Sequence, residues 1–202
     1  MKSMPAATRD KMIETAVRLF QRDGYEATSW RNLVKEAGTP WGSIHHHFPG
    51  GKEELGVAAI DAGGSAVAGV IEYCFDETPD PAAAVARWFA LSAELLVRSG
   101  YSAGCPVATV ALETAATSPP MKQASTRAFK RWSSIIGARL RRAGATPSAA
   151  REAAETVLAL LEGGLLLARV QRSRRPMKTA SRQAEVVMRQ ALSPNLATSA
   201  PS

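Results

Sequence analysis

Residues 30–48 read WRNLVKEAGTPWGSIHHHF, and this stretch decides the fold. Its first half places apolar residues at the i, i+3, i+4, i+7 spacing of one helix face, at Trp30, Leu33, Val34 and Ala37. Thr28 or Ser29 offers an oxygen for the helix N-terminus, and Gly38 ends the helix. The pattern predicts a helix of about two turns.

A second short helix is expected directly after Gly38. Thr39 is suited to cap it, and Pro40 fits the first helical position because proline lacks the N–H that is unsatisfied there. Ile44 and Phe48 then share one face and are expected to point inward. The breakers at residues 49–51 end this segment.

Two short helices joined by a glycine-containing turn are typical of a helix-turn-helix. A preceding helix over 8–23 supplies the rest of a small core. The second helix must carry small and polar residues outward, because its backbone has to lie in a DNA major groove about 12 Å wide. Gly42 and Ser43 satisfy that requirement. The stretch therefore predicts a DNA-binding surface.

The rest of the chain is also expected to be helical, giving an all-α protein of about nine helices. Of the 202 residues 46% are hydrophobic but only 6% aromatic, and strand-like alternation is absent. The remaining helices are expected over 52–76, 81–99, a short segment ending at 117, 121–143, 147–172 and 177–192. In the helix over 52–76 the predicted buried stripe is Leu55, Ala59, Ala62, Ala66, Val70 and Tyr73. The predicted division is a DNA-binding domain over 1–51, an effector-binding and dimerisation domain over 52–192, and a disordered tail over 193–202.

Charge alone does not locate the DNA-binding surface. The formal net charge is +7, but residues 1–55 hold eight Lys or Arg against seven Asp or Glu. The surplus lies in residues 130–202, with thirteen basic against four acidic side chains. The arginines around 169–175 follow a helix C-terminus and are expected to form a solvated surface, with an acidic partner or membrane surface as the alternative. The prediction of DNA binding therefore rests on geometry and on particular residues.

The run over 37–55, AGTPWGSIHHHFPGGKEEL, resembles the TetR/AcrR family of transcriptional repressors. The matching features are Ala-Gly, a capping turn, Gly-Ser, an apolar residue, an aromatic or histidine cluster ending in Phe48, then Pro49 and Lys52-Glu53. Pro40, residues 49–52 and the Gly-Cys-Pro at 104–106 are similar to the LmrA/YxaF-like branch.

This resemblance implies a repressor that binds a palindromic double-stranded operator as a homodimer. It implies that Ser43, His45 and His46 meet DNA and that Lys52 contacts phosphate, which also suits a lysine beside exposed helix N–H groups. The full set of predicted DNA-binding residues is Ser29, Thr39, Pro40, Trp41, Gly42, Ser43, His45, His46 and Lys52.

Two positions depart from the family pattern. His45 stands where a phosphate-contacting tyrosine is usual, and Trp41 where a basic or small polar residue is common. Protonation of histidine would strengthen phosphate binding, so operator affinity is expected to rise as pH falls from 8 to 6, unless the imidazoles are neutral and packed. Trp41 either packs on thymine methyl groups or sugars, or shields the helix-turn-helix core.

The helical half is expected to bind an effector and a second copy of the chain. The family implies a pocket for a small lipophilic or aromatic compound, and each candidate is alternatively plain core: Trp88, Phe89, Ser92, Leu95, Cys105, Val110, Phe129, Trp132, Ile136 and Leu161. It also implies a four-helix bundle between protomers, with an intrachain core as the alternative; the predicted interface is Leu158, Leu161, Leu165, Leu166, Val186 and Val187.

Other classes of protein fit the sequence less well. No nucleophile and base, phosphate loop, cofactor motif or metal-ligand spacing is visible, so neither an enzyme nor a cofactor is predicted. Cys74 and Cys105 are expected to be buried thiols, although Cys105 at a helix start is a candidate redox sensor. A helical interaction protein that does not bind DNA is the main alternative. Residues 1–7 do not read as a signal peptide, the apolar run over 157–170 is too short to cross a membrane, and a cytoplasmic location is expected.

Overall fold

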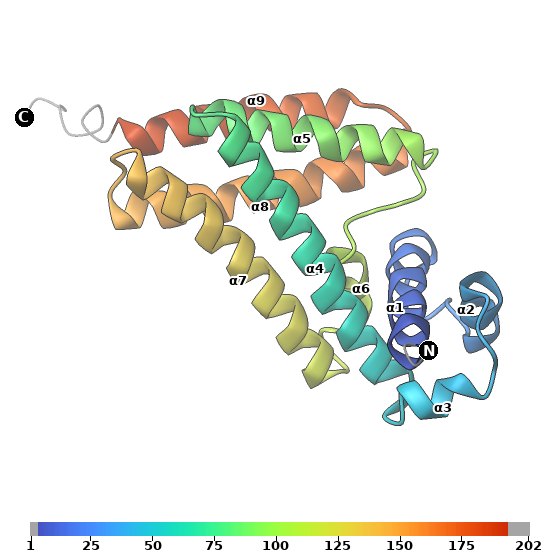
Figure 1. Ribbon diagram of the computed structural model, residues 1–202. Helices are drawn as coiled ribbons and strands as arrows, with labels where there is room; N and C mark the ends of the chain where they lie inside the picture. The colour runs from blue at the N-terminus through green and yellow to red at the C-terminus, as the bar shows by residue number, and fades with distance from the viewer. Residues whose placement is uncertain (1–3, 194–202) are drawn as a thin grey trace, which may run out of the picture. The chain divides into compact units, whose positions relative to one another are not determined.

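The computed structural model describes residues 4–193, and the side chains of residues 8–193. All regular structure in this range is helical, which confirms the all-α prediction (Figure 1). The nine described helices are α1 (Met4–Asp23), α2 (Trp30–Ala37), α3 (Ser43–His47), α4 (Gly51–Glu77), α5 (Pro81–Arg98), α6 (Ala108–Thr114), α7 (Pro119–Arg142), α8 (Pro147–Gln171) and α9 (Arg175–Leu192).

Local chemistry sets the ends of α2 as predicted. The Ser29 side chain accepts the N–H of Asn32 at 3.2 Å, which satisfies one of the donors left open in the first helical turn. Gly38 takes a left-handed conformation at φ 61°, which glycine adopts without a Cβ penalty. The two caps limit α2 to residues 30–37 and turn the chain toward α3.

Helix α3 begins later than the sequence suggested. The carbonyls of Pro40 and Trp41 accept the N–H groups of Ser43 and Ile44 at 3.1 and 3.2 Å, so residues 40–42 form a turn that precedes the helix. The Thr39 Oγ1 is buried without a hydrogen-bond partner. The prediction that Thr39 caps this helix and that Pro40 opens it is therefore wrong. The fixed φ of proline suits a turn as well as a helix start, so the sequence did not distinguish them.

The chain divides into two compact units. One comprises residues 1–66 and 102–128, and the other residues 67–101 and 129–202, so the boundaries fall inside α4 and α7. These units reflect packing, and the functional boundary after residue 51 stays a prediction. The predicted tail falls almost wholly on residues 194–202, which lie outside the described residues.

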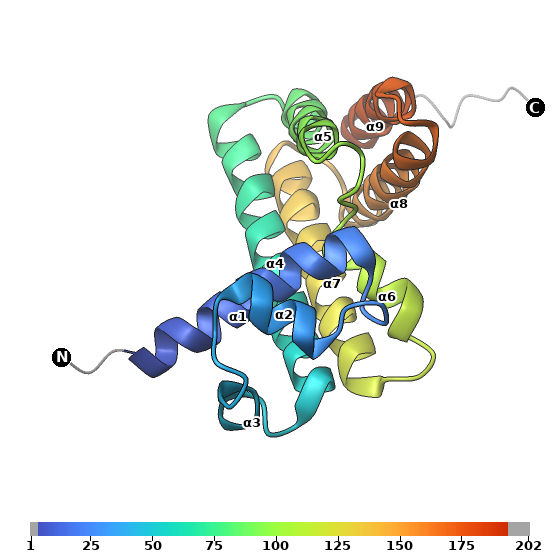
Figure 2. The ribbon, with the colours of Figure 1, turned by 90° about the vertical axis from the view of Figure 1, so that its right-hand side faces the viewer.

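The first unit has its core between α1, α2 and α3. Met12, Leu19 and Phe20 of α1 are at most 1% exposed and lie on one helical face. Leu33 is the buried residue of α2, and Phe48 closes the core after α3. Figure 2 shows these short helices grouped with α1. This packing fixes α3 as a rigid element, as a DNA-reading helix requires.

The second unit packs α8 against α9 and α5 against both. Its inner faces carry Trp88 and Phe89 from α5, Trp132 from α7, Leu161 from α8 and Met188 from α9, all buried. The pair of Gly164 and Met177 shows how close α8 and α9 approach: a Cβ on Gly164 would lie 3.0 Å from the Met177 sulfur. Small residues thus allow a dense helical core.

Helix α4 buries a different stripe from the one predicted. Leu55 and Ala59 are buried, but Ala62, Ala66 and Tyr73 are exposed. The buried face continues instead through Ile60, Gly63, Gly64, Ala68, Ile71 and Cys74. The glycines explain the difference, because a Cβ on Gly63 or Gly64 would lie 2.8 Å from a side-chain carbon of Pro106 or Ala128 respectively.

Helix α4 is also the described helix that is long and apolar enough, by length and composition, to cross a membrane. That test is weak support for a span, because the core helix of a soluble protein meets it too. The buried face of α4, including Leu55, Ile60 and Ile71, is already covered by other parts of the chain.

Candidate nucleic-acid interface

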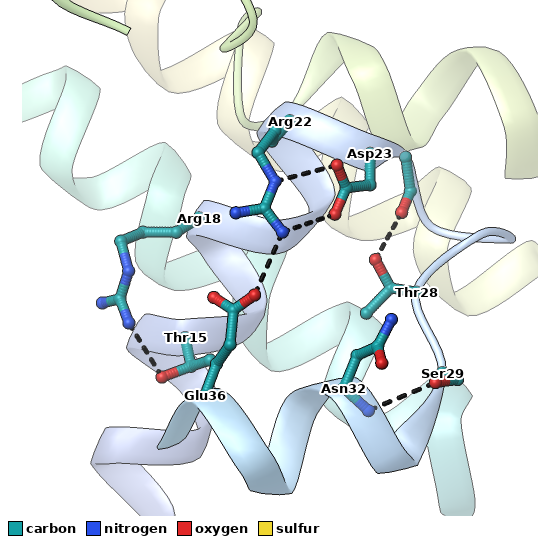
Figure 3. A network of polar contacts seen from close by, with 9 residues as sticks. Thr15, Arg18, Arg22, Asp23, Thr28, Ser29, Asn32 and Glu36 are labelled. Atoms are coloured by element: carbon teal, nitrogen blue, oxygen red, sulfur yellow. Dashed lines mark hydrogen bonds and ion pairs between the residues drawn. The ribbon is translucent and has the colours of Figure 1, made fainter. Parts of the chain in front are cut away.

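An exposed ion-pair network links α1 to α2 (Figure 3). The Arg22 guanidinium lies 2.8 Å from the Asp23 carboxylate and 3.0 Å from that of Glu36 on α2. Hydrogen bonds first to Asp23 and then to Glu36 raise the pKa of Arg22. The single guanidinium offsets part of the negative charge of the two carboxylates, and it links Glu36 of α2 to the end of α1.

Helix α3 has one face in the core and one in solvent. Ile44 and Phe48 are at most 3% exposed, and the Trp30 ring lies 6.3 Å from that of Phe48. His45 and His46 lie on the exposed side. The inward pair therefore matches the sequence prediction, and the outward pair is free to meet a partner.

The turn before α3 completes this outward surface. Pro40, Trp41 and Gly42 are all exposed, and a Cβ added to Gly42 would meet nothing within 4 Å beyond its chain neighbours. The Ser43 hydroxyl is half-buried and donates to the Pro40 carbonyl, which holds the turn against the start of α3. Ser29 is exposed but uses its side chain as the α2 cap, whereas Thr39 is half-buried. The exposed residues of the turn, Pro40, Trp41 and Gly42, carry no charge, so they can meet the bases of a groove but cannot pair with phosphates.

Lys52 lies in the first turn of α4 and is half-buried. Its Nζ donates to the Glu26 carbonyl at 3.3 Å and lies 4.3 Å from the centre of the Tyr25 ring. Burial lowers the pKa of Lys52, and the attraction of Glu26 and Glu113 opposes that shift. An ammonium group has three N–H donors, so one carbonyl contact leaves donors for a phosphate oxygen.

Two side chains that sequence reasoning missed support this surface from α6 and the following loop. The Glu113 carboxylate accepts the N–H of Glu26 at 2.8 Å, in the loop between α1 and α2. The Ser118 hydroxyl donates to the Glu53 carboxylate at the start of α4. Sequence separations of 87 and 65 residues explain why no local pattern revealed these contacts.

Helices α8 and α9 leave an apolar face uncovered in the described chain. Leu166, Leu167 and Val170 are exposed on α8, and Val186 is exposed on α9. Gly163 precedes them at the spacing of one helix face, with open space around it. Of the other residues predicted for the dimer interface, Leu165 and Val187 are half-buried, and Leu158 and Leu161 are buried within their own chain.

The residues predicted to line an effector pocket are divided between the two units. In the second unit, Trp88, Phe89, Trp132, Ile136 and Leu161 are buried, Ser92 and Phe129 are half-buried, and Leu95 is 60% exposed. Cys105 and Val110 are buried in the first unit. A groove of about 290 Å³ in the second unit contains Phe89 of this set, together with Ala90, Ala93, Met177, Lys178, Ser181 and Arg182.

The cysteines and histidines form no reactive cluster among the described residues. Cys74 and Cys105 are both buried and unbonded to each other. Cys105 precedes α6 by three residues instead of opening it, and its sulfur accepts the Ala108 N–H at 3.4 Å. Within residues 4–193, no three His, Cys, Asp or Glu side chains converge as metal ligands would.

Two short helices with an exposed second helix, held by a small core and followed by long packed helices, define an all-helical helix-turn-helix regulator. Residues 12–59 match the family described as bacterial regulatory proteins of the tetR family. Residues 81–183 match the C-terminal domain of LmrA/YxaF-like transcriptional regulators. The chain belongs to the TetR family, in its LmrA/YxaF-like branch.

Full-length relatives agree with this assignment. The chain is 33% identical over 182 residues to the uncharacterized HTH-type transcriptional regulator YxaF of Bacillus subtilis, covering 90% of this chain and 95% of that one. It is 35% identical over 171 residues to the HTH-type transcriptional regulator LmrA of the same organism, covering 84% and 90%. A TetR regulator from Legionella pneumophila has the same fold, with a TM-score of 0.78 at 21% identity over 92% and 97% of the two chains.

Family membership decides between the function classes left open by the sequence. The protein is a DNA-binding transcriptional regulator, not a helical interaction protein without a DNA target. Its relatives are regulators and form a non-enzymatic family. Regulators of this family are soluble proteins that bind DNA operators and small-molecule effectors as dimers.

Proposed function

We propose that the protein is a cytoplasmic, homodimeric repressor that binds a palindromic operator and leaves it when a small lipophilic or aromatic effector binds. Each protomer inserts α3 into a major groove, and two-fold symmetry places the two copies about 34–36 Å apart on the DNA. The proposal rests on the exposed face of α3 and on the turn that precedes it. The opposite face of α3 is buried in the core through Ile44 and Phe48, so only this exposed face can meet DNA.

The proposed DNA contacts combine positioning with base readout. Lys52 holds a phosphate, while Ser43, His45 and His46 approach the groove with the residues of the turn, Pro40, Trp41 and Gly42. Ser29 and Thr39 flank this surface, Ser29 by capping α2 and Thr39 from the start of the turn. Phosphate contacts set the register of the protein, and the side chains of α3 and the turn select the sequence.

The proposed dimer interface is the uncovered face of α8 and α9. Leu165, Leu166, Val186 and Val187 form it together with Leu167 and Val170. Burying such a face against its symmetric copy removes apolar surface from water in both protomers. Open space at Gly163 allows the facing helix to approach closely.

The proposed effector contacts lie on the aromatic groups of the second unit, where Phe129 and Ser92 are half-buried. The Phe129 and Trp132 rings meet edge to face at 5.3 Å, an arrangement that an aromatic guest can extend. Release from the operator requires the effector to bind more tightly to the DNA-free arrangement of the dimer, because equal affinity for both arrangements shifts nothing.

A salt-dependent mobility-shift assay tests the DNA-binding proposal. The probe is the intergenic DNA upstream of the coding sequence, titrated with the full-length protein at several salt concentrations. Loss of one phosphate contact per protomer in Lys52→Ala is expected to reduce the log–log salt slope by about 2 per dimer. Lys122→Ala is the matched control, because Lys122 is an exposed lysine of the same unit outside the proposed surface. An equal slope for Lys52→Ala and wild type contradicts the role of Lys52.

Cys105 supports one second candidate, a thiol-based release of DNA. The Ala108 N–H donates to its sulfur, but the residue is only 7% exposed, so access for an oxidant is restricted. Peroxide is therefore expected to leave operator binding unchanged. Peroxide release that is lost in Cys105→Ser but kept in Cys74→Ser would establish the redox candidate instead.

A further inference from the structure

Trp41 is the tryptophan that the described chain leaves in solvent. Its residue is 57% exposed, whereas Trp88 and Trp132 are at most 2% exposed and Trp30 is half-buried beside Phe48. Within residues 8–193 it makes no hydrogen bond through its side chain and no ring contact. More than half of the Trp41 surface is therefore available to a partner.

The backbone around Trp41 holds the exposed indole next to α3. The Trp41 carbonyl accepts the N–H of Ile44, a residue that is anchored in the core. Pro40 precedes it with a fixed φ, and Gly42 follows with no side chain and open space around it. The large apolar ring thus stands beside the recognition helix with no neighbouring side chain from Gly42 to screen it.

The chemistry of indole narrows what Trp41 can recognise. It carries no charge and a single N–H donor, so it cannot form the bidentate pair with guanine that arginine or lysine forms. The apolar group exposed in the major groove is the 5-methyl group of thymine. Packing of the ring on this methyl group removes both from water, whereas cytosine offers only a polar amino group at the neighbouring position.

We propose that Trp41 of each protomer packs on one pyrimidine 5-methyl group and thereby selects thymine at one position of each operator half-site. This inference rests on the proposed docking of α3 in the major groove. It assigns to Trp41 a role in specificity that the phosphate contact of Lys52 cannot supply, because phosphates carry no sequence information.

Replacement of thymine by deoxyuridine, one symmetric pair at a time, tests the inference. The replacement deletes the methyl group and keeps base pairing. The probe is a duplex selected from a randomised pool by the full-length wild-type protein, with each symmetric pair of thymines replaced in turn. At one pair the wild type is expected to lose about fourfold in affinity per methyl group, or about fifteenfold for both half-sites. The other thymines serve as controls on the same duplex.

Two variants assign the effect to the indole. Trp41→Ala is expected to bind thymine and deoxyuridine duplexes equally at the sensitive pair, while Trp41→Phe keeps most of the preference. Both variants should retain the wild-type melting temperature, because the side chain is exposed. Selection against deoxyuridine that persists in Trp41→Ala would overturn the inference, because another residue would then read the methyl group.

The outcomes separate this inference from the proposed function. If the wild type binds the selected duplex with a steep salt dependence but tolerates deoxyuridine at every thymine, the inference fails and the proposed function stands. If the wild type retards no duplex at low salt, the proposed function fails and the inference fails with it. Methylation offers a further check: cytosine at the sensitive position should weaken binding, and 5-methylcytosine should recover part of the loss.

Discussion

Truncation of the uncovered apolar face on α8 is expected to separate the protomers. Leu166 is 57% exposed and Val170 is 74% exposed in the single chain, so most of each side chain remains available for burial in a dimer. At about 0.8 kcal/mol per buried CH₂, the exposed part of the three carbons lost in Leu166→Ala contributes about 1.4 kcal/mol per protomer. Symmetry doubles this to about 3 kcal/mol, or a dimer Kd roughly a hundredfold higher. Val170→Ala should act similarly.

Sedimentation equilibrium over a dilution series measures the dimer Kd directly, and a mobility shift on a two-half-site duplex measures its consequence. Leu112→Ala is the matched control, because Leu112 is 83% exposed on α6 and lies outside the proposed interface. It should leave both measurements unchanged. A dimer Kd for Leu166→Ala and Val170→Ala that matches the value for Leu112→Ala would refute the assignment of this face.

Three further outcomes follow from individual contacts. Leu33→Ala should lower the free energy of unfolding by about 2–5 kcal/mol in urea titrations, because Leu33 is 1% exposed in the helix-turn-helix core. Ser29→Ala should cost about 1 kcal/mol in the same assay through loss of the α2 cap. Burial first, and then the charges of Glu26 and Glu53, raise the pKa of Tyr25 to about 12. The contribution of the protonated phenol to the free energy of unfolding is therefore fully present below pH 10. It is lost as pH rises toward 12, because the unfolded chain releases this proton first. A Tyr25→Phe difference spectrum at the phenolate band should show that late ionisation.

The helix-turn-helix could be predicted because each of its decisive signals is local. Ser29 and Gly38 act through bonds within three or four residues, and the spacing of Leu33, Ile44 and Phe48 records which side of each short helix is buried. The start of α3 was predicted wrongly, because its local signal fits two different structures. Pro40 is compatible with both a turn and a helical first position, so only the hydrogen bonds of the folded chain distinguish the two.

The support of the DNA-binding surface could not be predicted, because its contacts join distant segments. Glu113 reaches the loop after α1, and Ser118 reaches Glu53 at the start of α4. Neither of these contacts follows from a periodic pattern, although the Ser118 hydroxyl also accepts the Met121 N–H in the first turn of α7. The buried face of α4 was also hard to predict from sequence. A search for apolar side chains passes over Gly63 and Gly64, yet the absence of their side chains allows that face of α4 to pack closely.

The proposed dimer face illustrates how structure adds to a pattern that sequence leaves ambiguous. The apolar residues of α8 over 157–170 surround much of the helix, so spacing alone does not say which leucines the chain uses for its own core. Leu158 and Leu161 are buried within the protomer, in which α8 packs against α9 and α5. What remains, Leu166, Leu167 and Val170, continues the line begun by Gly163 at i, i+3, i+4 and i+7. An apolar stripe of that regularity, exposed in one chain, suits the symmetric partner of the proposed dimer, and this is why truncation there is expected to weaken DNA binding without altering any residue proposed to touch DNA.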